Sequence, residues 1–72
     1  MQTNAEAPKS EPARILTERD AARYLAVSVY SMRVWRVAGR GPDFIRFGRL
    51  VRYTLAALDR YLAEHTIRRR VA

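Results

Sequence analysis

Residues 17–39 of the chain read TERDAARYLAVSVYSMRVWRVAG and contain the signals for two short helices. Thr17 can cap a helix, and Asp20 lies three residues later, where an acid near the helix N-terminus resembles a capping box. Leu16 is expected to pack against the first turn as a hydrophobic staple. The apolar stripe that follows at helical spacing consists of Ala21, Ala22 and Leu25, with Tyr24 as a further candidate. These features predict a first helix from Glu18 to about Leu25.

A second helix is predicted from Val29 to about Ala38, with Ser28 as its N-terminal cap. Only three residues separate it from the first helix, which favours a helix-turn-helix. Gly39 is expected to end the helix, and Gly41-Pro42 prevents it from resuming. Met32 and Trp35 share one face at i, i+3 spacing. The residues left on the other faces are Tyr30, Ser31, Arg33, Val34 and Val37.

A β-hairpin is predicted next, from two β-prone runs, Phe44–Phe47 and Leu50–Tyr53, on either side of Gly48-Arg49. Strict alternation cannot turn both Phe44 and Phe47 inward, so a bulge or twist near Pro42 is expected.

The chain then returns to a helix. Thr54 caps a third helix that ends near Glu64, with Tyr61 beside its inward residues. The residues predicted to face inward are Leu55, Leu58 and Leu62. The predicted fold is mainly α with a small β-hairpin, a winged helix-turn-helix. Its expected parts are a disordered N-terminal arm (1–14), a winged helix-turn-helix domain (15–64) and a basic tail (65–72).

Composition limits the classes of function. A length of 72 residues nearly excludes a self-contained enzyme, and a net charge of +7 favours a polyanionic partner. Lys9 is the only lysine, and arginine suits phosphate and guanine edges better than lysine does. With no cysteine and one histidine, His65, no metal site and no cofactor are expected. The absence of a signal peptide or membrane span from the sequence predicts a cytoplasmic, nucleoid-associated protein without a membrane partner.

The sequence resembles a known family in several short motifs taken together. These are Leu16-Thr17-Glu18, Ala21-Ala22, Val27-Ser28, Trp35-Arg36-Val37, Gly39-Arg40-Gly41-Pro42, Arg46-Phe47-Gly48-Arg49, Val51-Arg52-Tyr53 and Leu58-Asp59. In combination they are similar to the excisionase-type, MerR-like winged helix-turn-helix domains of phages and integrative elements, over Ile15–Ala63. Val29 and Tyr30 depart from the small or polar residues common there, so the cognate DNA sequence cannot be carried over.

The resemblance implies that the second helix enters the major groove of double-stranded DNA and that the hairpin wing reaches an adjacent minor groove. It also implies a role as a recombination directionality factor, which bends an attachment site so that an integrase excises a mobile element. Relatives act as several protomers on direct repeats, so head-to-tail self-association on DNA is expected. One side of that contact is expected in the wing or residues 39–43, and the other in residues 61–71.

Candidate contact residues follow from the resemblance and from the residue types. The major-groove candidates are Tyr30, Ser31, Arg33 and Val34, with a solvated helix face as the alternative. Arg49 at the hairpin tip is the minor-groove candidate, with an ordinary polar turn residue as the alternative. The phosphate candidates are Thr17, Ser28, Arg36, Arg46 and Arg52. Arg36 could instead pair with Glu18 or Asp20. The tail residues Arg68, Arg69 and Arg70 either bind flanking DNA or remain solvated.

Other readings are weaker. Trp35, Phe44 and Tyr61 are expected to pack in the protein and not to stack on bases. The carboxylates Asp43, Asp59 and Glu64 show no catalytic pairing, so no catalytic residue is expected. A transcriptional regulator with the same fold is the nearest alternative function. A protein-binding, antitoxin-type module is a further one, although the arginine excess argues against it.

Overall fold

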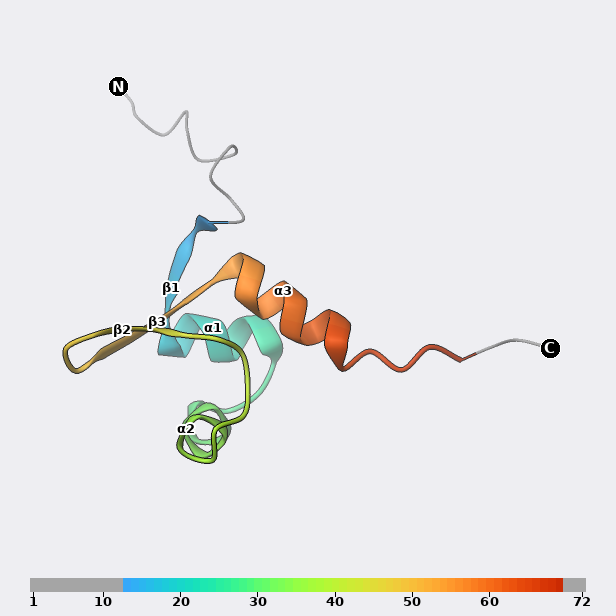
Figure 1. Cartoon of the computed structure of the whole chain (residues 1–72), viewed down its shortest axis with the longest axis horizontal. Helices are drawn as coiled ribbons and strands as arrows, with labels where there is room; N and C mark the ends of the chain where they lie inside the picture. The colour runs from blue at the N-terminus through green and yellow to red at the C-terminus, as the bar shows by residue number, and fades with distance from the viewer. Residues whose placement is uncertain (1–12, 70–72) are drawn as a thin grey trace, which may run out of the picture.

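The computed structural model describes residues 13–69, which form three helices and a three-stranded antiparallel sheet (Figure 1). The elements in chain order are β1 (Ile15–Thr17), α1 (Glu18–Leu25), α2 (Val29–Val37), β2 (Ile45–Phe47), β3 (Leu50–Thr54) and α3 (Leu55–Glu64). In Figure 1, α3 lies on one side of α1 and α2 is seen end-on at the other. The β2–β3 hairpin extends away from the helices. This arrangement confirms the predicted winged helix-turn-helix.

The helix starts are set by local hydrogen bonds. Thr17 Oγ1 accepts from the Asp20 amide at 3.1 Å, and Ser28 Oγ accepts from the Ser31 amide at 3.0 Å. Thr54 caps α3 in the same way, through the Ala57 amide. Each cap satisfies an amide that the first helical turn leaves without a backbone partner, so the three predicted N-termini are confirmed.

The helix ends differ in their residues. After α2, Gly39 has φ 76°, and the Arg40 amide donates back to the Trp35 carbonyl at 2.7 Å. After α1, Ala26 adopts the same left-handed conformation, with φ 60°, while the next amide bonds to the carbonyl of Ala22. Glycine has no Cβ to crowd the backbone there and alanine has one, so the turn of the helix-turn-helix holds a strained residue.

The sheet contains a strand that the sequence patterns did not predict. β1 pairs with β3 with Leu16 opposite Tyr53, and the order of strands is β1-β3-β2. Leu16, expected only as a staple, is therefore also a buried sheet residue. The Leu55 amide donates to the carbonyl of Arg14 beside this strand, so the last residue of the predicted arm already contacts the domain. Residues 1–12 of that arm, and Arg70 of the tail, lie outside the described residues.

The hairpin has the predicted two-residue turn, with Phe47 paired to Leu50. Gly48 has φ 61°, as the first central residue of a type II′ turn requires. The expected bulge or twist rested on placing both Phe44 and Phe47 in one strand, and this is wrong. Phe44 lies before β2, and the pairing with β3 is regular from Ile45 to Phe47.

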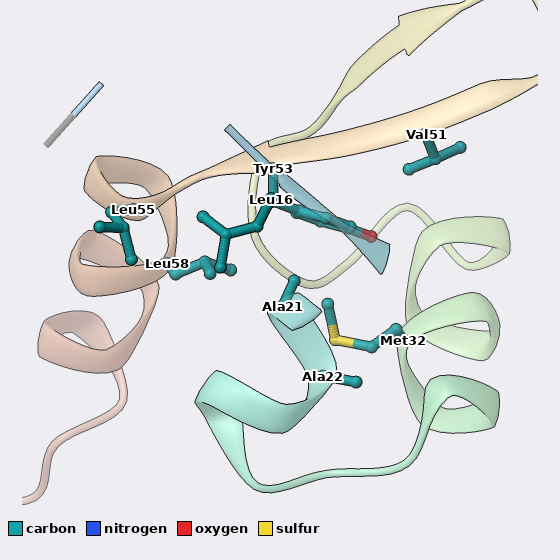
Figure 2. Close-up of a cluster of buried hydrophobic side chains, with 8 residues drawn as sticks. All are labelled: Leu16, Ala21, Ala22, Met32, Val51, Tyr53, Leu55 and Leu58. Atoms are coloured by element: carbon teal, nitrogen blue, oxygen red, sulfur yellow. The ribbon is translucent and has the colours of Figure 1, made fainter. Parts of the chain in front are cut away.

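One buried cluster joins the sheet to all three helices (Figure 2). Its members are Leu16, Ala21, Ala22, Met32, Val51, Tyr53, Leu55 and Leu58. Met32 extends from α2 toward α1 in Figure 2, and Trp35 packs against the cluster as a half-buried residue. Trp35 also contacts Tyr61, with ring centroids 5.7 Å apart, which accords with their predicted packing roles.

The prediction that Leu62 faces inward is wrong, because its side chain is 42% exposed. The first half of α3 lies beside α1, and its second half extends past the end of that helix (Figure 1). Beyond the end of α1, the last turn packs through Tyr61 against Trp35 and leaves Leu62 exposed, while Ala57 in the first half is buried. Spacing on a helix fixes which residues share a face, but the length of the neighbouring helix decides how far that face is covered.

Candidate nucleic-acid interface

The face of α2 that points away from the core is a stripe at i, i+3, i+4 and i+7 spacing. Its members are Tyr30, Arg33, Val34 and Val37, and all four are exposed. Tyr30 is 76% exposed and the Arg33 side chain 62%. Of the predicted major-groove residues, Ser31 lies at the edge of this stripe, half-buried, and its hydroxyl accepts a hydrogen bond from Ser28 at 3.1 Å.

Val37 belongs to this stripe and was not among the predicted contact residues. The signal that identifies it is the same helical spacing, since residue 37 follows residue 30 by two turns. It is 88% exposed and adds apolar surface beside Arg33. Apolar side chains on such a helix can contact thymine methyl groups.

Glu18, in the first turn of α1, joins two arginines of α2. Its Oε2 lies 2.7 Å from Arg36 Nη1, and its Oε1 lies 3.2 Å from both Nε and Nη2 of Arg33. Arg36 Nη1 also donates to the hydroxyl of Tyr53 at 3.2 Å. Of the two alternatives for Arg36, the structure therefore shows the pairing with Glu18. Its side chain is only 15% exposed, so little of it is open to a phosphate.

These contacts set the charge of the cluster. Burial acts to raise the pKa of Glu18, but hydrogen bonds from Arg36 and Arg33 outweigh it and hold the pKa below its ordinary value. Burial acts to lower the pKa of Arg36, and its bonds with Glu18 and Tyr53 instead raise that pKa. Both groups are thus ionised at neutral pH.

The wing places Arg49 at an exposed position in the hairpin turn. Phe47 and Leu50 flank the turn, and both are more than half exposed. Arg46 has its guanidinium over the ring of Phe44, 5.6 Å from the centroid. The hairpin tip thus combines one arginine with apolar side chains, at a distance from the core.

The remaining phosphate candidates differ in exposure and in the hydrogen bonds that they already make. Arg52 is half-buried and donates to the carbonyl of Val51 at 2.9 Å, whereas Arg46 is exposed. Thr17 and Ser28 use their hydroxyl oxygens as helix caps. In the tail, Arg68 and Arg69 are exposed. Contact with phosphate stays a prediction for Arg46, Arg52, Thr17 and Ser28.

Three aspartates elsewhere in the described region have partners outside the α2 stripe. Asp43 pairs with Arg60 at 2.9 Å, and Asp59 accepts from the hydroxyl of Tyr24 at 2.5 Å. Asp20 lies 3.5 Å from Arg23. Within residues 13–69, no three histidine, cysteine, aspartate or glutamate side chains come together in a way that could hold a metal ion. The helices of the same region are too short and too polar to span a bilayer.

Comparison with known protein families gives a match to the family described as helix-turn-helix domain, over residues 15–66. The match covers more than half of the chain and includes all of the helices and strands described above. No curated protein matches the sequence.

Proposed function

Since the chain belongs to the helix-turn-helix domain family, we propose that it binds double-stranded DNA sequence-specifically, with α2 as the helix that reads the major groove. The observation that carries this proposal is the exposed stripe of α2, in which Arg33 lies between Tyr30 and Val37. A helix fits the major groove, and arginine can donate two hydrogen bonds to a guanine edge there. The positive charge of the chain supplies the sequence-independent part of the affinity.

The wing is the second contact in this proposal. Arg49 at its tip would enter the minor groove next to the major-groove site, where a narrow groove concentrates negative potential. Exposed apolar side chains on either side of the turn, Phe47 and Leu50, would lie against the sugar walls. Apolar residues in a minor groove promote bending of the duplex, which supports an architectural role.

We further propose that this role is that of a recombination directionality factor. The protein would bind an attachment site cooperatively, bend it, and favour integrase-mediated excision of a mobile element without performing chemistry itself. The support is the resemblance of residues 15–63 to excisionase-type domains. A single domain of this size buries only about 600 to 1,000 Å² on DNA, so several copies would be needed for tight occupancy.

A selection experiment tests the DNA-binding proposal. The full chain is incubated with a library of random duplexes, and bound molecules are recovered and sequenced over repeated rounds. We expect a motif to be enriched, and we expect a duplex carrying it to bend when bound, as measured by energy transfer between its labelled ends. Failure to enrich any motif would remove sequence-specific recognition from the proposal.

A second experiment tests the excision role. An excision reaction with an integrase encoded beside the gene, with and without the protein, should proceed faster in its presence. DNA binding that represses or activates a neighbouring promoter, with no effect on excision, would favour the regulator instead.

A further inference from the structure

The contacts of Glu18 link the buried sheet to the exposed face of α2. Tyr53 is 1% exposed and accepts a hydrogen bond from Arg36, and Arg36 in turn holds Oε2 of Glu18. The other carboxylate oxygen, Oε1, faces Arg33. The carboxylate is thus fixed from the core side by one arginine and contacts a second arginine on the outer side.

The bond to Glu18 leaves part of Arg33 unused. Oε1 of Glu18 accepts a hydrogen bond from Nε and lies 3.2 Å from Nη2, and the guanidinium has further N–H groups on Nη1 and Nη2. Those groups are the ones with which an arginine binds O6 and N7 of guanine. A guanidinium held along one edge keeps its plane and loses rotamer freedom before it meets DNA, so less entropy is lost on binding.

On the basis of the proposed DNA-binding function, we infer that Glu18 is a positioning residue, which orients the guanidinium of Arg33 and so contributes to discrimination between DNA sequences. A carboxylate near DNA repels phosphate and on that ground alone should weaken binding to every sequence. The two effects can be measured separately. Repulsion by Glu18 lowers the affinity for every DNA sequence, whereas positioning of Arg33 raises the affinity for the preferred site alone.

The experiment uses Glu18→Gln in the full chain, with a duplex selected by the wild-type protein and a scrambled duplex of the same composition. We expect the ratio of the two affinities to fall about threefold to tenfold, as for residues in direct contact. Affinity for the scrambled duplex should stay the same or rise. Asp59→Asn is the matched control, since it removes the same charge at an exposed position of α3 that lies outside the α2 stripe and outside residues 61–71. It should leave the ratio unchanged.

A double-mutant cycle shows whether the effect passes through Arg33. In an Arg33→Ala background, Glu18→Gln should cause no further fall in the ratio. A ratio that is unchanged in the single variant, or that falls as much without Arg33 as with it, overturns the inference. If Glu18→Gln does not fold by circular dichroism, Glu18→Asp replaces it, because it keeps the charge and shortens the reach toward Arg33.

The inference and the proposed function fail in different ways. If the wild-type protein selects no sequence, the DNA-reading proposal itself is wrong, and this is seen before any variant is made. If the wild-type protein selects a motif and the Glu18 variants keep the full ratio, only the positioning role is wrong.

Discussion

Arg33 is the side chain on which sequence recognition depends most in this proposal. Arg33→Ala should reduce the preference for the selected duplex over a scrambled one by about 1 to 3 kcal/mol, because a bidentate contact to a base is lost. Competition titrations at fixed salt measure both affinities. Arg23→Ala removes the same charge from the hollow lined by β1, α1 and α3, and should leave the preference unchanged. Equal losses on both duplexes for Arg33→Ala would make it a phosphate contact.

Glu18 also gives the fold a dependence on pH. Its pKa is lowered in the folded state, so it stabilises the fold above its unfolded pKa of about 4.3, and this stabilisation is lost as the pH falls through the folded value. At neutral pH, Glu18→Gln should lower the free energy of unfolding by about 1 to 3 kcal/mol. The difference from wild type should shrink below about pH 4.

Urea denaturation at a series of pH values measures this difference. Glu64→Gln, at an exposed position, should stay within about 0.5 kcal/mol of wild type at neutral pH. A difference between wild type and Glu18→Gln that is constant down to about pH 3 would mean that the ion pairs of Glu18 do not stabilise the fold.

At the scale of elements, the wing is separable from the core. Arg49→Ala should weaken DNA binding by about 1 kcal/mol or more. The free energy of unfolding should stay within about 0.5 kcal/mol of wild type, because the side chain at the hairpin tip is exposed. A small molecule that occupies the minor groove provides the specific measurement. It should displace the wild-type protein more readily than Arg49→Ala at matched occupancy, and equal displacement would remove the minor-groove assignment.

The turn between α1 and α2 offers a gain in stability. Ala26 has φ 60°, a conformation in which a Cβ costs about 1 to 2 kcal/mol. Replacing alanine by glycine removes this cost, but the freer unfolded chain of glycine offsets about 0.5 to 1 kcal/mol of the gain. Ala26→Gly should therefore raise the free energy of unfolding by about 0.5 to 1 kcal/mol. Ala56→Gly, at an exposed helical position in α3, should lower it. Losses at both positions, measured by urea denaturation, would show that the turn is unstrained.

At the scale of the whole molecule, the structure limits which surfaces could form the proposed head-to-tail contact between copies on DNA. The loop before β2 adjoins α3 in one protomer, since Asp43 pairs with Arg60 and Gly41 lies against Trp35, which contacts Tyr61. The loop and α3 are therefore neighbours and do not form opposite ends. The β2–β3 hairpin and the segment after α3 do lie at opposite ends of the domain (Figure 1). A head-to-tail arrangement would thus join the wing of one copy to the tail of the next.

Removal of the tail tests this assembly, and the structure indicates where to cut. His65 and Thr66 close α3, with the Thr66 hydroxyl donating to the Leu62 carbonyl at 2.6 Å, so the truncation should begin at Arg68. We expect the shortened protein to lose cooperativity on a multi-repeat duplex more than affinity for a single repeat. Equal loss on both would make the tail an electrostatic anchor. A stable dimer without DNA, seen by sedimentation, would contradict the assembly model.

The sequence by itself determined where most elements begin and end. Thr17, Ser28 and Thr54 cap their helices, Gly39 ends α2, and Gly48 begins the hairpin turn, as predicted. The physical reason is that each of these features needs only hydrogen bonds or backbone angles within a few residues. No distant part of the chain has to be known in order to predict them. The exposed stripe of α2 is predictable for the same reason, because helical spacing is local.

Only the tertiary structure decided which distant groups meet. β1 exists because Leu16 reaches Tyr53 across the sheet, and Leu62 is exposed because α1 ends before α3 does. The sequence left Glu18 and Asp20 as alternative partners of Arg36, and the packing of α2 on α1 brings Arg36 to Glu18. Contacts between residues so far apart depend on the angles and lengths with which the elements pack, and local propensities do not contain that information.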